Sequence, residues 1–237
     1  MADSNRDLFE RVVRLLEPVL ENLVFVGGCA TGMLITDPAT AGIRSTNEVE
    51  AIADVTSYAT YTSLANRLRA IGLKQDGSNG APASRWRLDT ATVDIVPTDP
   101  SVLGFSNTWY GPAIAAAQRM TIAGGQVRLV APAYFVATKL EAFHGRGHGD
   151  VIASSDLEDI VIVVDGRPQL LDEIARADQQ VRQFIAAEIR TLVDNRRFAD
   201  SLAGFLPPDR ASQARRPLLE QRLHAIAALQ RPNPQAP

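Results

Sequence analysis

The sequence has almost no cysteine: Cys29 is the single one among 237 residues. One cysteine excludes an internal disulfide and is typical of a protein in a reducing cytoplasm. Long apolar runs are also missing, because no stretch approaches the ~18 consecutive apolar residues of a membrane-spanning helix. No basic segment followed by a short apolar run opens the chain, so we expect no export. We predict a cytoplasmic protein without membrane contact.

An excess of either charge is lacking as well, since 24 basic residues face 27 acidic ones for a net charge of −3. This balance excludes an overall surface for polyanions. The distribution is uneven, however: from Arg176 onward the chain holds ten arginines and six acids, a local net charge of +4. Either this region is an ordinary solvated helical face or it contacts RNA phosphates. The arginines for that contact would be Arg190, Arg196, Arg197, Arg215 and Arg216.

Lysine is rare too, with Lys74 and Lys139 against 22 arginines. Where arginine is the usual cation, a lysine indicates a site that needs a compact charge. Lys139 lies in the middle of a predicted helix over residues 133–144. Two interpretations stay open at this point: its stem follows an apolar stripe with the ammonium in water, or its ammonium contacts a phosphate.

Two adjacent glycines, Gly27 and Gly28, join an apolar run over residues 23–26 to a predicted helix over 28–36. A strand that turns on glycines into a helix N-terminus presents free backbone N–H groups, which suit phosphate. The alternative is a tight turn that needs only backbone freedom. The acids described next favour the phosphate interpretation.

Three acids lie in strand-like segments downstream of the glycines. Glu48 and Glu50 are two residues apart in a predicted strand over 46–54, so both carboxylates leave the same face. Asp94 lies in a second predicted strand over 92–96, paired in a hairpin with residues 85–88. Among apolar neighbours Asp94 would be costly if buried alone, so a metal or a basic partner is expected. A phosphate cradle beside three carboxylates predicts a site for a nucleoside triphosphate (NTP) and divalent metal.

The remaining pattern predicts an α/β first half and a helical second half. Apolar positions at helical spacing predict a helix over residues 5–20, and Ser57 is suited to cap a helix over 58–71. A further helix is predicted over 107–118. The expected organisation is an α/β domain over 1–130, a helical region over 131–230 and a disordered tail over 231–237.

Five blocks of sequence carry a family resemblance. They are VGGCA at 26–30, RSTNEVE at 44–50, VDIVPTD at 93–99, ATKLEAF at 137–143 and SDLEDI at 155–160. In this order they resemble the nucleotidyltransferase toxins of the abortive-infection type (AbiEii/AbiGii), in the DNA polymerase β-like superfamily. The resemblance spans about residues 24 to 170. It implies a polymerase β-like mixed sheet with helices, and transfer of a nucleoside monophosphate (NMP) from an NTP with release of pyrophosphate.

The resemblance also implies cofactors, partners and residue roles. Two divalent ions, Mg²⁺ or Mn²⁺, would be needed, the acceptor would be RNA such as tRNA, and an antitoxin would restrain the protein. Asp156 and Glu158 suit the N-terminus of a helix, which leaves Asp159 to pair with Lys139 or to orient the acceptor. The implied nucleotide-binding residues are Gly27, Gly28 and Lys139, the metal ligands Glu48, Glu50 and Asp94, and the catalytic residues Asp94, Lys139 and Asp159.

The chain departs from that family at the metal-binding acids. The usual pair is Asp-x-Asp or Asp-x-Glu, and here it is Glu48-Val49-Glu50. Each extra methylene moves a carboxylate outward by about 1.5 Å, and Mg²⁺ tolerates little distortion, so Mn²⁺ would be better tolerated. Three functions therefore stay open: an active enzyme on RNA, a degenerate module that binds nucleotide, RNA or protein without catalysis, and a nucleotidyltransferase for small, antibiotic-type molecules.

Overall fold

The structure is a computed structural model that describes residues 4–40, 42–89, 91–146 and 150–229. The predicted tail over 231–237 lies outside the described residues. Among the helices of the described ranges, none combines the length and apolar character needed to cross a membrane.

The chain divides into two compact units. The first contains Met1–Gly32 and Arg44–Ala131, and the second contains Met33–Ile43 and Pro132–Pro237. Residues 33–43 therefore belong to the second unit although both flanking segments belong to the first. The domain boundary after residue 130 stays a prediction.

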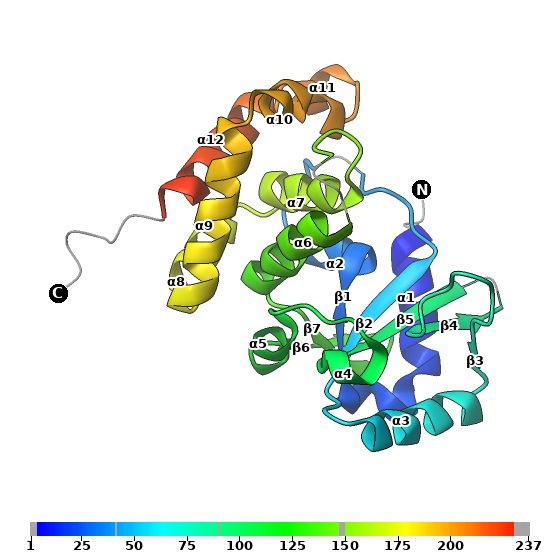
Figure 1. Cartoon of the computed structure of the whole chain (residues 1–237). Coiled ribbons are helices and arrows are strands. Elements are labelled where there is room, and N and C mark those ends of the chain that lie inside the picture. Colours follow the sequence, from blue (N-terminus) through cyan, green and yellow to red (C-terminus); the bar gives the residue numbers. More distant parts are fainter. Residues whose placement is uncertain (1–3, 41, 90, 147–149, 230–237) are drawn as a thin grey trace. The chain divides into compact units, whose positions relative to one another are not determined.

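A seven-stranded mixed sheet forms the first unit, with strand order β3-β4-β5-β2-β1-β7-β6 (Figure 1). Every residue of β1 is buried, as expected for a strand inside a sheet that is covered on both faces. The strands are β1 Leu23–Val26, β2 Glu48–Ala53, β3 Lys74–Gln75, β4 Arg85–Leu88, β5 Ala91–Pro97, β6 Gln118–Ile122 and β7 Gly125–Leu129.

Strand register places the acidic residues side by side. β2 and β5 are parallel with Glu50 opposite Asp94. β4 and β5 form the predicted hairpin, with Arg85 opposite Asp94 on the other side of β5. β1 is antiparallel to β2 with Val26 opposite Glu50, so the residue before the glycine pair is next to the acid strand. The strands β1, β2, β4 and β5 thus hold the site.

Helices of the first unit match the sequence predictions in part. The predicted helix over 5–20 ends earlier, because Pro18 has no N–H and the chain continues as a 3₁₀ helix. Ser57 caps α3 as predicted, with its side chain accepting from the Thr60 N–H. The predicted helix over 107–118 is shorter because β6 begins at Gln118. The elements are α1 Ser4–Leu15, η1 Glu17–Asn22, α2 Gly27–Leu34, α3 Tyr58–Ala70, α4 Pro100–Leu103 and α5 Tyr110–Ala115.

The second unit is helical, as the sequence predicts. Its most buried helix is α7, in which the residues from Leu157 to Gly166 are all buried except Glu158. Among the other helices, α8, α10 and α12 pack against α6, α7 or α9. Their bounds are α6 Pro132–Arg146, α7 Ser155–Gly166, α8 Leu170–Arg176, α9 Gln179–Asp194, α10 Arg196–Ser201, η2 Leu202–Phe205, α11 Arg210–Gln213 and α12 Arg216–Ala228.

Residues 33–43 are attached to the C-terminal end of α7. The backbone N–H groups of Thr36 and Asp37 both donate to the Gly166 carbonyl at 2.9 Å. The Asp37 carboxylate accepts from Arg215 Nη2 at 2.7 Å, and Arg215 Nε lies 2.9 Å from both oxygens of the fully buried Asp165. Arg215 thus bridges two carboxylates inside the second unit.

Candidate metal and nucleotide site

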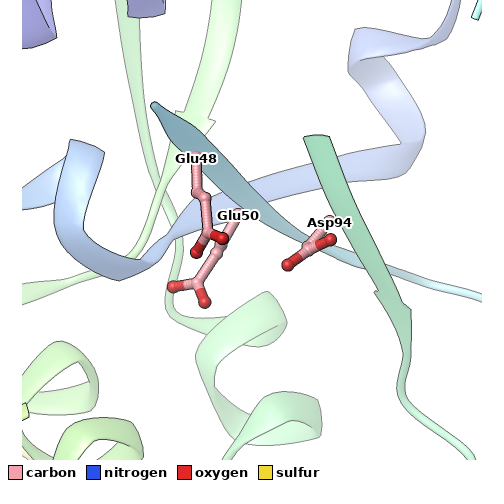
Figure 2. A group of neighbouring side chains, drawn as sticks. All are labelled: Glu48, Glu50 and Asp94. Carbon is pink, nitrogen blue, oxygen red and sulfur yellow. The ribbon is translucent and has the colours of Figure 1, made fainter. Parts of the chain in front are cut away.

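Glu48, Glu50 and Asp94 lie together, as the sequence predicts (Figure 2). The alternation of β2 sends both glutamates to one face, and the parallel register brings Asp94 beside Glu50. One carboxylate oxygen of each residue lies within 4.8 Å of those of the other two. Their exposure decreases along the cluster, with Glu48 exposed, Glu50 intermediate and Asp94 buried. We call these three residues the acid cluster.

The acid cluster suits a divalent cation. All its donors are carboxylate oxygens, the ligands preferred by Mg²⁺ and Mn²⁺. Opposite ligands of an Mg²⁺ octahedron are about 4.2 Å apart, since each lies about 2.1 Å from the ion. The oxygens within 4.8 Å of one another thus need only small movements to share an ion. The ligand role of each residue stays a prediction.

Arg85 also belongs to this site, although no motif in the sequence indicates it. Its Nε and Nη2 donate to the two oxygens of Asp94 at 2.9 and 2.7 Å, and Nη2 also donates to Glu48 Oε1 at 3.0 Å. The hydrogen bonds to Asp94 raise the pKa of the guanidinium above its ordinary value. Arg85 is therefore the basic partner that burial of Asp94 requires. The hairpin register, which joins Leu88 to Ala91, was the available signal.

Gly27 links the glycine turn to the acid cluster. It has a φ of +73°, a conformation that favours glycine. A Cβ atom at this position would lie only 1.7 Å from Glu50 Oε2 and 2.6 Å from Glu50 Cδ. Glu50 thus occupies the space that any other residue at position 27 would fill. Gly28 follows in the first turn of α2. The turn interpretation is supported for Gly27, and phosphate binding by Gly27 and Gly28 stays a prediction.

Lys139 lies in the second unit within a buried ionic cluster. Its Nζ is 2.7 Å from Asp159 Oδ2 and 3.1 Å from Asp156 Oδ1. The lysine side chain is 7% exposed, so the interpretation with its ammonium in water is wrong. The predicted Lys139–Asp159 pair is present. Asp156 does more than complement the dipole of α7, because it shares the same ammonium. A role for Lys139 or Asp159 in catalysis stays a prediction.

The arginines proposed to contact RNA divide into two groups. Arg215 is bound to Asp165 and Asp37, so we correct its assignment: its guanidinium stabilises the interior. Arg190 donates to the Ala227 carbonyl at 3.3 Å, which also directs it inward. The more exposed members are Arg196, which pairs loosely with Asp200, Arg216, which pairs with Glu220, and Arg197.

One solved structure shows the fold of this chain. No protein-family model and no curated protein matches the chain. Among solved structures it is similar to an antigenic nucleotidyltransferase-like protein from Paracoccidioides brasiliensis, with a TM-score of 0.50, 19% identity and coverage of 89% of this chain and 97% of that one. It is also similar to JHP933 from Helicobacter pylori, with a TM-score of 0.49, 12% identity and coverage of 94% and 90%. The first similarity confirms the predicted fold class: this chain has a nucleotidyltransferase-like fold.

Proposed function

We propose that this protein is a metal-dependent nucleotidyltransferase that moves an NMP from an NTP to an acceptor and releases pyrophosphate. The observation that carries the proposal is the acid cluster on two adjacent parallel strands, with Gly27 packed against Glu50. The cluster lies on β2 and β5, and the glycine turn opens α2 directly after β1, all within the first unit. The nucleotidyltransferase-like fold supports the same chemistry.

Each candidate residue receives a role in this proposal. A divalent cation held by Glu48, Glu50 and Asp94 would offset negative charge on the phosphates. The backbone N–H groups at Gly27 and Gly28 would donate to phosphate oxygens. The Asp94 carboxylate would accept the proton of the acceptor hydroxyl. Lys139 would stabilise the leaving pyrophosphate, and Asp159 would orient the lysine, as their 2.7 Å ion pair supports.

The acceptor in this proposal is RNA, with tRNA as the first candidate. This choice rests on the five sequence blocks that resemble those of the AbiEii/AbiGii toxins, and it includes an antitoxin as partner. Exposed arginines offer phosphate contacts that depend little on RNA sequence. Arg196, with 94% of its side chain exposed, and the exposed Arg197 are the candidates for this contact.

A second function is favoured by one observation. Arg85 binds both oxygens of Asp94 and one of Glu48, the same atoms that a metal would need. A guanidinium fixed there permanently would leave a nucleotidyltransferase-like fold without its metal chemistry. The protein would then be a non-catalytic module that binds nucleotide, RNA or a protein partner, and the Glu-x-Glu pair fits that state.

A transfer assay tests these functions. The full chain is incubated with each α-labelled NTP, Mg²⁺ or Mn²⁺, and total RNA. We expect labelled RNA from the wild type and a loss of about 10²-fold or more from Asp94→Asn, because a carboxylamide neither holds the cation as well nor accepts the proton. Glu50→Gln should lose activity similarly. The matched control is Asp54→Asn, an exposed aspartate just after β2, which should transfer normally.

Other outcomes would contradict the proposal. Absence of labelled product, together with an NTP-dependent rise in melting temperature, would support the non-catalytic module. Label on a small molecule rather than on RNA would support the antibiotic-type enzyme. Melting curves of each variant keep loss of folding separate from loss of chemistry.

A further inference from the structure

Arg85 has no part in the proposed transfer, although it holds the most buried acid of the site. We propose that Arg85 is an internal counter-ion that competes with divalent metal for Asp94 and Glu48, and that it exchanges to the triphosphate when nucleotide binds. Metal and nucleotide would then bind cooperatively, and free metal alone would bind weakly. This inference deepens the proposed function and rests on it for the nucleotide.

The competition follows from shared atoms. Arg85 engages Asp94 through two parallel hydrogen bonds, at 2.9 and 2.7 Å, and this bidentate geometry is the strongest that arginine makes with a carboxylate. A metal ion needs lone pairs of the same oxygens. A guanidinium and a divalent cation a few ångströms apart also repel each other. Binding of the metal thus requires Arg85 to release at least part of its contact with Asp94.

The exchange is feasible because the cluster reaches solvent. The side chain of Arg85 is 25% exposed and that of Glu48 is 47% exposed, whereas that of Asp94 is 10% exposed. Arg85 can therefore turn away from Asp94 without opening the buried core. Its planar fork fits phosphate oxygens as well as a carboxylate. A triphosphate beside the glycine turn would offer this alternative partner, and Asp94 would become available to the metal that accompanies the nucleotide.

The chain provides a matched control on the same strand. Arg87 is two residues from Arg85 in β4 and therefore leaves the same face. It pairs with Asp76 at 3.0 Å instead of with the acid cluster. Arg87→Gln removes one positive charge from the same strand and leaves the contacts of Arg85 with Asp94 and Glu48 in place.

Mn²⁺ binding measured by electron paramagnetic resonance tests the inference without any need for catalysis. Titrations use the full chain, with and without a non-hydrolysable NTP analogue. We expect Arg85→Gln to bind Mn²⁺ at least about tenfold more tightly than wild type without nucleotide, because a nearby positive charge is removed. Arg87→Gln should stay within about twofold of wild type, since Arg87 pairs with Asp76 and its half-exposed charge is screened. The analogue should strengthen Mn²⁺ binding more in wild type than in Arg85→Gln.

Equal or weaker Mn²⁺ binding by Arg85→Gln would overturn the inference. If this variant fails to fold, Arg85→Lys provides the test. A single ammonium cannot make the two parallel hydrogen bonds of a guanidinium, so we expect Arg85→Lys to bind Mn²⁺ more tightly than wild type. Unchanged Mn²⁺ binding by Arg85→Lys would overturn the inference. Transfer by wild type combined with unchanged Mn²⁺ affinity in Arg85→Gln would reject the inference and keep the proposed function. Tighter Mn²⁺ binding by Arg85→Gln, with no nucleotide transfer by wild type, would reject the proposed enzymatic function and keep the competition between Arg85 and the metal.

Discussion

Two arginines in this protein bridge a pair of carboxylates, and they do so in different surroundings. Arg85 in the first unit joins Asp94 to Glu48, and Arg215 in the second unit joins Asp165 to Asp37. The contact distances are similar, at 2.7 to 3.0 Å. Asp165 is fully buried, whereas Glu48 is 47% exposed. The same local chemistry therefore stabilises the interior in one unit and remains open to exchange in the other.

The hydrogen-bonded surroundings strengthen this difference. Arg215 Nη2 also donates to the Asp165 carbonyl at 3.0 Å, and Arg222 donates to the Val164 carbonyl at the same end of α7. Positive charge beside the C-terminal carbonyls of a helix is favourable. Arg85 lies on a strand and donates to Asp94 and Glu48, so its position depends on the acid cluster itself. A buried ionic cluster with several backbone contacts is a structural feature, and an accessible one is a candidate for binding.

The largest expected effect is on the buried bridge. Arg215→Ala leaves Asp165 without its guanidinium in the interior, which should lower the free energy of unfolding by about 3–5 kcal/mol. Denaturant unfolding followed by circular dichroism measures the change. Arg216→Ala is the control, because its pairing with Glu220 is exposed and within one helix, and its effect should be below about 0.5 kcal/mol. Equal effects of the two variants would remove the distinction between the clusters.

A smaller effect is expected at the accessible bridge. Arg85→Gln should lower the free energy of unfolding by about 1–2 kcal/mol, because Asp94 loses a partner near solvent that water can partly replace. Added Mn²⁺ should recover part of this loss by binding the folded acid cluster. The same unfolding experiment with and without Mn²⁺ measures both quantities. A loss as large as that of Arg215→Ala would show that the two arginines are structurally equivalent.

The smallest effect concerns pH. The hydrogen bond from Arg215 lowers the pKa of Asp37 below its ordinary 3.8. A carboxylate with a lowered pKa stabilises the folded state above pH 3.8, and this contribution is lost as the pH falls through the lowered value. Asp37→Asn should therefore have a lower melting temperature than wild type at neutral pH. The difference in melting temperature should shrink as the pH falls below 3.8. Melting curves from about pH 7 to about pH 2 would reveal a constant gap if the charge of Asp37 were unimportant.

The parts of the site that could be predicted from the sequence depend on contacts between residues close together in the chain. The period of two along β2 put Glu48 and Glu50 on one face from sequence alone, whereas the parallel register that brings Asp94 beside Glu50 is seen only in the structure. The contact between Arg85 and Asp94 was within reach too, since they are nine residues apart across a hairpin. Close packing of Gly27 on Glu50 could not be predicted, because it depends on a side-chain position and on the distance between neighbouring strands.

Contacts between distant parts of the chain explain the rest. Arg215 and Asp37 are 178 residues apart, and no pairing rule for local structure connects them. The same arginine therefore resembled a candidate for RNA phosphates when judged by charge alone. Lys139 is intermediate: its lone occurrence in the helical half indicated a special position, but its burial between Asp156 and Asp159 depends on how α6 packs on α7.

The attachment of residues 33–43 to the second unit has a consequence for synthesis of the chain. Asp37 emerges from the ribosome long before its partner, because 178 residues separate it from Arg215. At 5–20 residues per second this interval is roughly 9–36 s. Glu48, Glu50 and Asp94 are all made within this interval, before Arg215 is available to Asp37. This connection therefore forms only after the strands that carry the acid cluster have been made.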